Sequence, residues 1–203
     1  TQSPSVSIII PSYNSSATLD EVLRGALAQT GGHLKEIIVV DSSDDKLTPA
    51  ILSFYPSDQI RVIRLAQKTI PAIGRNVGAK EAQGDVLAFL DADAVPEEDW
   101  TWRIAQVYQG GCRTGGGAIK LPDFQRKNAL AAAQLFLQCN EFLEVSPKRR
   151  VRFSPSCNTF CEKKLFEEIG GFPEIRAAED VLFGIRVNQV SPYLFFPEVR
   201  VRH

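Results

Sequence analysis

Four short apolar runs that alternate with helix-forming segments constrain the fold of this chain more than any other feature. Residues 6–10 and 36–40 are rich in β-branched side chains, and residues 60–65 and 86–90 form two further strand-like runs. The segments between them, residues 18–27, 47–54 and 70–83, are expected helices. Apolar strands that alternate with helices indicate a parallel sheet covered on both faces. We therefore expect an α/β fold with a Rossmann-like, mostly parallel central sheet flanked by helices.

Local signals predict where several helices begin and end. Thr18, followed three residues later by Glu21, has the pattern of a capping box, and Gly31 with Gly32 ends the helical pattern that follows. Beyond about residue 110 the chain becomes glycine-rich, and further helices are expected at 128–143, at 162–169 and from 179 onward. The sequence contains no internal repeat and no low-complexity tract, so we expect a single domain over residues 1–203.

Polar residues follow three of the predicted strands at the point where each strand ends. They occupy residues 11–14, 41–45 and 91–93. Parallel sheets bind ligands beyond the carboxyl ends of their strands, so these residues are candidates for a binding site. Asp91 and Asp93 place two carboxylates on one turn, an arrangement that suits Mg²⁺ or Mn²⁺ bound with a substrate diphosphate. Two aspartates after a strand are also common in solvated turns and helix caps.

The overall charge argues against nucleic acid as a partner, and the composition suggests a reducing compartment. The chain has 23 basic and 24 acidic residues, a net charge of -1, and only four cysteines. We expect free thiols and a cytoplasmic location, at the inner face of a membrane if the protein binds one. No run is long enough to span a bilayer, and the first residues lack the charged-then-apolar order of a signal peptide. The chain contains no methionine. We therefore expect a trimmed start, with any membrane anchor in segments outside this chain.

Four motifs together resemble the family-2 glycosyltransferases, which have the GT-A fold. Residues 74–93 read GRNVGAKEAQGDVLAFLDAD, residues 8–14 read IIIPSYN, residues 37–41 read IIVVD, and GGFP at 170–173 leads to Glu179 and Asp180. The likeness spans nearly the whole chain and keeps the order of the motifs. It implies an inverting, metal-dependent transfer of a sugar from a UDP- or GDP-sugar to a hydroxyl of a saccharide or lipid-linked acceptor. Residues 1–110 would form the half that binds the nucleotide sugar, and residues 111–203 the half that faces the acceptor.

The resemblance also implies a role for individual residues. Asp180 would be the catalytic base, with Glu179 as the second choice. Asp41 would meet the base or ribose, although Ser42 replaces a second acidic residue often found there, a departure that a GDP-sugar would fit. Arg75 would lie near the diphosphate, and Asn158 would line the sugar and acceptor pocket. The remaining nucleotide-binding residues would be Pro11, Tyr13, Asn14, Asp91 and Ala92, and the metal ligands would be Asp91, Asp93 and His203.

Several of these residues have simpler explanations. Arg75 would otherwise form a surface ion pair with Glu81 or Asp85, and the acidic pair at 179–180 would only complement a helix dipole. His203 would otherwise belong to a frayed end or a purification tag, and His33 is expected on a solvated turn. The basic residues Lys148, Arg149, Arg150 and Arg152 are a solvated loop, or bind an acceptor phosphate or, weakly, a membrane surface.

Two other functions compete with transfer. A domain of the same fold that binds nucleotide sugars without catalysis would not need the set Asp91, Asp93 and Asp180, which is complete here. A nucleotidyltransferase would need a glycine-rich basic loop after the first strand, which the sequence at 11–14 does not provide. The chain also lacks the Q-x-x-R-W sequence of processive polysaccharide synthases, so addition of a single sugar is the better interpretation.

Overall fold

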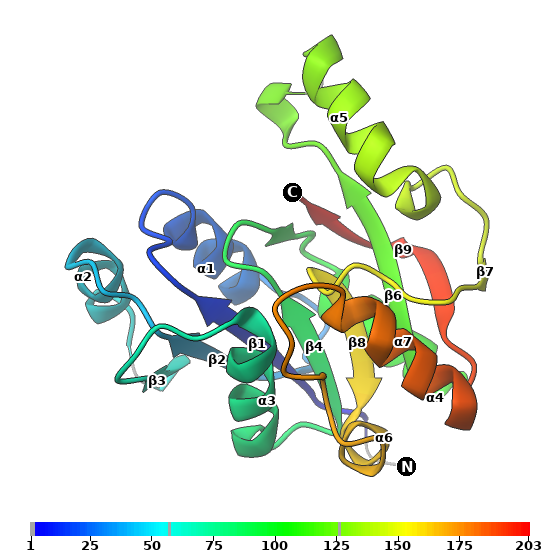
Figure 1. The fold of residues 1–203 in the computed structure, drawn as a ribbon, viewed down its shortest axis with the longest axis horizontal. Helices are drawn as coiled ribbons and strands as arrows, with labels where there is room; N and C mark the ends of the chain where they lie inside the picture. Colours follow the sequence, from blue (N-terminus) through cyan, green and yellow to red (C-terminus); the bar gives the residue numbers. More distant parts are fainter. Residues whose placement is uncertain (1–2, 57, 126) are drawn as a thin grey trace.

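The computed structural model describes residues 3–56, 58–125 and 127–203, and it is an α/β domain built on one sheet (Figure 1). The first half contains β1 (Val6–Ser12), α1 (Leu19–Leu27), β2 (Leu34–Asp41), α2 (Leu47–Ser53), β3 (Ile60–Arg64), α3 (Pro71–Glu81) and β4 (Val86–Leu90). The second half contains β5 (Val95–Pro96), α4 (Trp100–Gln109), β6 (Thr114–Lys120), α5 (Ala129–Cys139), β7 (Arg149–Arg150), β8 (Asn158–Glu162), α6 (Lys163–Glu168), α7 (Glu179–Val190) and β9 (Leu194–Arg202). Short 3₁₀ turns lie at Asp123–Gln125 and Asn140–Phe142.

The predicted parallel sheet is confirmed in the first half of the chain, whereas the whole sheet is mixed. Its strand order is β3-β2-β1-β4-β8-β6-β9-β5, and β7 pairs with β9 outside this order. β3, β2, β1 and β4 run parallel to their neighbours. β8 enters antiparallel beside β4, and β6 is antiparallel to β8. Beyond β4, β6 and β9 also pair in parallel, whereas β8, β5 and β7 pair antiparallel with their neighbours.

The sheet is apolar on both faces because helices cover both of them. Ile8 and Ile10 of β1 point into a core shared with α1 and α4, whereas Ile9 points into a second core shared with α3, α6 and α7. All three side chains are fully buried. This explains why β1 and β4 are almost continuous apolar runs, whereas β3 at the edge of the sheet carries arginines.

Two glycines of α3 let this helix lie directly against the sheet. A Cβ atom on Gly78 would be 2.5 Å from Cγ2 of Ile9, and one on Gly74 would be 2.9 Å from Cβ of Pro11. Neither position can hold a side chain without moving the helix. The close approach fixes α3 over the ends of β1 and β2, and it carries Arg75 with it.

The structure corrects the predictions for Thr18 and His33, places Asn158 inside the protein and confirms the free thiols. Thr18 precedes α1 but makes no capping bond, because its hydroxyl donates to the Ala92 carbonyl at 2.7 Å. His33 is buried and not on a solvated turn, and its Nδ1 lies 2.9 Å from the Pro4 carbonyl. Asn158 is buried too. All four cysteines are free thiols, as expected.

The described part of the chain contains no helix that is both long and apolar enough to cross a membrane. The longest helix, α7, has 12 residues and carries charged side chains.

The contact between Gly78 and Ile9 predicts the cost of adding one methyl group to α3. Gly78→Ala should lower the free energy of unfolding by about 1–3 kcal/mol, because the overpacked helix must shift away from β1. Urea denaturation measures this difference. Lys80→Ala changes an exposed position on the same helix and should leave stability nearly unchanged. Equal stability of Gly78→Ala and the parent would contradict the tight contact between α3 and β1 at Ile9.

Candidate functional site

Three strand ends bring the predicted site residues to one edge of the sheet. Ser12 at the end of β1 lies in register with Asp41 at the end of β2, and β4 ends beside them at Leu90. The turn that carries Asp91 and Asp93 follows directly. The motifs that are separated by up to 80 residues in the sequence therefore meet where a parallel sheet binds its ligands.

Tyr13 and Asn14 form a polar network with Asp44 just beyond β1. The Tyr13 hydroxyl donates to Asp44 at 2.9 Å, and the Asn14 amide donates to the same carboxylate at 2.7 Å. These two hydrogen bonds, that of Asn14 first, lower the pKa of Asp44. The ammonium of Lys68 lies 4.0 Å from the centre of the Tyr13 ring. One ring face therefore already has a cationic neighbour, which the sequence motifs did not indicate.

Asp41 is placed at the predicted site but is completely buried. Its carboxylate pairs with Arg64 and accepts hydrogen bonds from the backbone and the hydroxyl of Ser43, at 3.1 and 2.5 Å. Arg64 comes from β3 and lies in register with Asp41. A basic residue at the end of the neighbouring strand was the available signal for this pair.

Arg75 is the centre of the site. Its side chain is 2% exposed, and its guanidinium donates to Asp91 at 2.6 Å and to Glu179 at 3.1 Å. Burial opposes its charge, yet the two carboxylates outweigh burial and raise the pKa of the guanidinium. The surface pair with Glu81 or Asp85 does not form. One buried cation therefore joins the β4 turn to the start of α7.

The acidic pair opens α7 after an unusual backbone conformation. Ala178 has φ +62°, in the left-handed region that residues with a Cβ rarely adopt. One oxygen of Asp180 accepts the Val181 N–H at 2.8 Å. Burial first, and then the neighbouring charge of Glu179, raise the pKa of Asp180. A carboxyl group of this kind accepts a proton more readily than an ordinary surface aspartate.

Asp93 and His203 lie side by side. Nε2 of His203 is 3.2 Å from Oδ1 of Asp93, and this contact raises the pKa of His203 and lowers that of Asp93. The charge of Asp91 also raises the pKa of His203. The backbone N–H of His203 donates to the Lys120 carbonyl at 2.8 Å, so this end of the chain is not frayed.

The described residues include no preformed group of three or more His, Cys, Asp or Glu side chains arranged around a metal. Two carboxylates and an imidazole on neighbouring elements are nevertheless the donor types that Mn²⁺ accepts, and Mg²⁺ or Mn²⁺ usually takes further oxygens from phosphate and water. The chemistry of Asp91, Asp93 and His203 therefore fits a divalent ion shared with a diphosphate.

Ala92 contributes a backbone carbonyl to the site, whereas Asn158 is a buried residue of the core. The Ala92 carbonyl accepts the Thr18 hydroxyl, which ties the β4 turn to the start of α1. Asn158 is 1% exposed, accepts a hydrogen bond from the Trp100 indole and donates to the carbonyls of Ala118 and Val199. Its polar atoms are fully used inside the protein, so the prediction that it lines the sugar pocket is wrong.

Cavities border this edge of the sheet on two sides. A small one of about 50 Å³ is lined by Pro11, Tyr13, Ser42 and Gly74, at the place predicted for the nucleoside. Another of about 470 Å³ includes Asp93, Thr18, Phe124 and Arg202.

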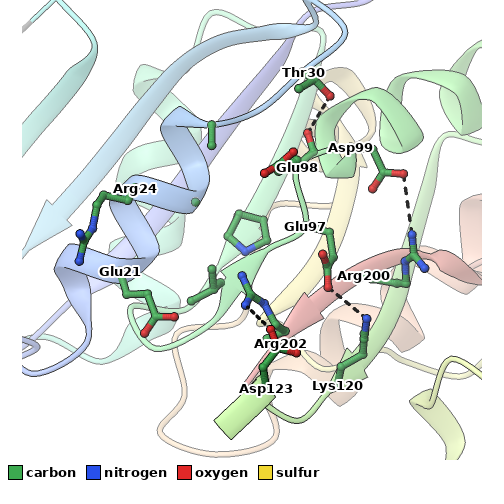
Figure 2. Close-up of a pocket in the computed structure, with 14 residues that line it drawn as sticks. Glu21, Arg24, Thr30, Glu97, Glu98, Asp99, Lys120, Asp123, Arg200 and Arg202 are labelled. Carbon is green, nitrogen blue, oxygen red and sulfur yellow. Dashed lines mark hydrogen bonds and ion pairs between the residues drawn. The ribbon is translucent and has the colours of Figure 1, made fainter.

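A groove of about 690 Å³ lies beside β5, and Figure 2 shows the charged side chains that line it. Lys120 pairs with Glu97, Arg200 with Asp99 and Arg202 with Asp123. Among the described residues that line this groove, none belongs to the predicted nucleotide site. The volume of the groove is therefore a poor guide to the chemistry, which gathers around Arg75.

The sequence profile of glycosyl transferase family 2 matches residues 7–170. The chain belongs to this family. Glycosyltransferase AglE of Haloferax volcanii is 27% identical to this family-2 chain over 177 residues, which are 84% of this chain and 56% of AglE. The chain thus spans about half the length of this curated relative, which is itself named a glycosyltransferase.

Solved structures show the same GT-A fold. TarS 1-349 of S. aureus, in complex with UDP-GlcNAc, superposes on this family-2 domain with a TM-score of 0.75 at 21% identity, covering 97% of this chain and 57% of that one. The mannosyltransferase PcManGT of Pyrobaculum calidifontis, in complex with GDP-Man and Mn²⁺, gives a TM-score of 0.74 at 20% identity, covering 100% and 57%. The expected family and fold are confirmed.

The ion pairs of Arg75 predict a large effect of removing its charge. Arg75→Met leaves Asp91 and Glu179 without their shared cation and should lower the free energy of unfolding by about 2–4 kcal/mol, somewhat less than for a fully buried pair because both carboxylates reach solvent. Thermal or urea unfolding measures this loss.

The matched control is Arg61→Met, because Arg61 forms an exposed pair with Glu81 in which both side chains are more than 40% accessible. This variant should lose less than about 1 kcal/mol. Losses of the same size in the two variants would contradict the central role of Arg75.

Proposed function

We propose that this domain transfers a sugar from a nucleoside diphosphate sugar to an acceptor hydroxyl with inversion at the anomeric carbon. The observation that carries the proposal is the double ion pair of Arg75, which holds the Asp91 turn and the acidic pair of α7 in one site. A donor diphosphate at Asp91 and a base at Asp180 would then face the same sugar.

The reaction needs one proton acceptor and one stabilised leaving group. The acceptor oxygen attacks the anomeric carbon while its proton passes to a carboxylate oxygen of Asp180, and the bond from the anomeric carbon to the diphosphate oxygen breaks. A positioned base of this kind typically contributes about 10²–10⁴-fold to the rate. Because attack and departure take place on opposite faces of the sugar, the configuration inverts and no covalent enzyme intermediate forms.

A bound Mn²⁺ or Mg²⁺ would neutralise the charge that develops on the departing diphosphate. Asp91, Asp93 and His203 would hold it. Arg75 donates to one oxygen of Asp91 at 2.6 Å and so orients that carboxylate. The Mn²⁺ reported with PcManGT supports this part of the proposal.

The nucleoside would bind at the ends of β1 and β2. Pro11, Tyr13 and Asn14 border this place, and the second face of the Tyr13 ring offers a stacking surface. Asp41 is fully buried against Arg64 and Ser43, so we assign it the role of ordering that loop in place of direct contact with the base or ribose. Ser42 follows Asp41 where the family resemblance leads us to expect a second acid, and this departure would fit a GDP-sugar.

Asp180→Asn should separate catalysis from binding and folding. We expect sugar transfer to fall by at least about 10²-fold, because the amide cannot take the proton, while nucleotide affinity stays unchanged. Release of nucleotide from a panel of UDP- and GDP-sugars with Mn²⁺ measures sugar transfer. Calorimetric titration measures nucleotide affinity. Glu167→Gln removes an exposed carboxylate on α6 and should keep full activity.

The same variant should melt at the same temperature as the parent or higher at pH 7. Burial raises the folded pKa of Asp180, so its charged form costs stability above that pKa, and the cost disappears as the pH falls below the value of the unfolded chain. The melting temperatures of the two proteins should therefore converge in acid. Equal turnover by Asp180→Asn and the parent would remove Asp180 from the mechanism and favour a domain that binds nucleotide sugars without catalysis.

Removal of the divalent ion should abolish transfer and weaken nucleotide binding. In a thermal-shift series with UDP, GDP, dTDP and CDP, we expect the largest rise with GDP, and we expect a chelator to eliminate most of it. Asp93→Asn should need a higher Mn²⁺ concentration for half of the effect, by about tenfold. Asp99→Asn, at a carboxylate paired with Arg103 outside the site, is the control. A nucleotide-induced rise in melting temperature that changes neither with the chelator nor in Asp93→Asn would contradict the metal site.

A further inference from the structure

Helix α5 presents an apolar surface to solvent. Figure 1 shows it standing away from the sheet, and its 11 residues include no charged side chain. Leu130 is 78% exposed, Phe136 58% and Leu137 80%. The opposite side of the helix is occupied, because Leu135 and Cys139 pack against the core. An ordinary surface helix has polar residues where α5 has leucine and phenylalanine.

The apolar surface extends into the segments on both sides of α5. Phe124, in the turn before the helix, is 80% exposed, and Val145, in the loop after it, is 84% exposed. An exposed apolar area of this kind marks a surface that binds another apolar body. We call these five side chains, Phe124, Leu130, Phe136, Leu137 and Val145, the α5 surface.

The chain segment that contains the α5 surface is net positive, unlike the whole chain. The described residues between 121 and 152 include five basic and three acidic side chains, a net charge of +2, whereas the whole chain carries -1. Two of the cations have neutral partners, so their charge is not cancelled. Arg150 donates to Asn188 at 2.9 Å, and the ammonium of Lys148 lies 4.5 Å from the centre of the Phe196 ring.

This combination selects one kind of partner. A second copy of the chain, paired about a two-fold axis, would bring two positive segments together, which disfavours it. An anionic bilayer accepts apolar side chains below the headgroups and attracts lysine and arginine at its surface. At 1.5 Å per residue α5 is about 16 Å long, too short to cross the roughly 30 Å of hydrocarbon. The helix therefore fits a position in the plane of the interface.

We infer that the α5 surface docks this domain on an anionic lipid membrane, with Leu130 and Leu137 at the acyl boundary and Lys148 and Arg150 at the headgroups. The inference is independent of sugar transfer, because it needs neither donor nor acceptor. It gives the membrane a contact within the domain itself, stronger than the weak contact expected from the basic patch alone.

Sedimentation with vesicles tests the inference without donor or acceptor. The parent should bind vesicles of phosphatidylcholine and phosphatidylglycerol in equal amounts, and bind vesicles of phosphatidylcholine alone roughly tenfold more weakly. The double variant Leu130→Gln, Leu137→Gln should lose about tenfold or more of its binding to the anionic vesicles. Lys148→Gln with Arg150→Gln should lose a similar amount, and its remaining binding should depend less on added salt than that of the parent.

A matched control changes exposed apolar residues far from α5 in the chain. Leu47 is 65% exposed and Phe54 84% exposed, both at the ends of α2, and Leu47→Gln with Phe54→Gln should bind as the parent does. A single Leu137→Trp variant should show a blue shift of its added fluorescence with anionic vesicles, a direct readout of insertion that does not depend on the loss of binding.

Three results would overturn the inference. The parent could fail to bind anionic vesicles, or it could bind them as well after both leucines are replaced. Light scattering could also show a dimer in solution that becomes a monomer in Leu130→Gln, Leu137→Gln, which would assign the surface to a second copy of the chain.

Discussion

The ion pairs of one buried guanidinium decide the geometry of the site. Arg75 reaches Asp91 and Glu179 from α3, and these two carboxylates come from segments almost 90 residues apart in the sequence. The arginine can lie there only because Gly74 and Gly78 bring α3 into contact with β1. The packing of α3 on one face of the sheet therefore sets the ion pairs at its edge, and the Asp91 turn and the proposed base depend on the same helix.

The first half of the fold could be predicted from the sequence because its information is local. Ile8, Ile9 and Ile10 favour a strand by themselves, and alternation with helices then leaves a parallel sheet as the economical arrangement. β6 and β9 were less predictable. Gly115 to Gly117 have low strand propensity, and they occur in a strand because the neighbouring backbone comes so close that a Cβ on Gly117 would lie 1.9 Å from the Val199 carbonyl oxygen. The need for glycine in β6 is set by β9, about 80 residues later in the sequence, so local propensity could not indicate it.

The sequence indicated which strand ends carry the candidate site residues, but it did not indicate the hydrogen-bond and ion-pair partners of their side chains. The family resemblance placed Arg75 near the diphosphate, but no pattern in the sequence indicates that Asp91 and Glu179 share its guanidinium. Asn158 looked like a pocket residue and serves as a buried hydrogen-bonding link between β8 and its neighbours, and Asp41 is closed off by Arg64. Long-range partners of polar side chains depend on strand order, which the sequence alone left open.

The left-handed alanine before α7 has a consequence for how the acidic pair moves. A residue with a Cβ in this conformation stores on the order of 1 kcal/mol, and any motion that lets Ala178 leave it releases that energy. The strain at Ala178 therefore favours motion of the first turn of α7, and the ion pair between Arg75 and Glu179 opposes that motion. Glu179 and Asp180 would therefore shift together if the backbone at Ala178 relaxed, and the side chain of Arg75 restrains this local conformational change.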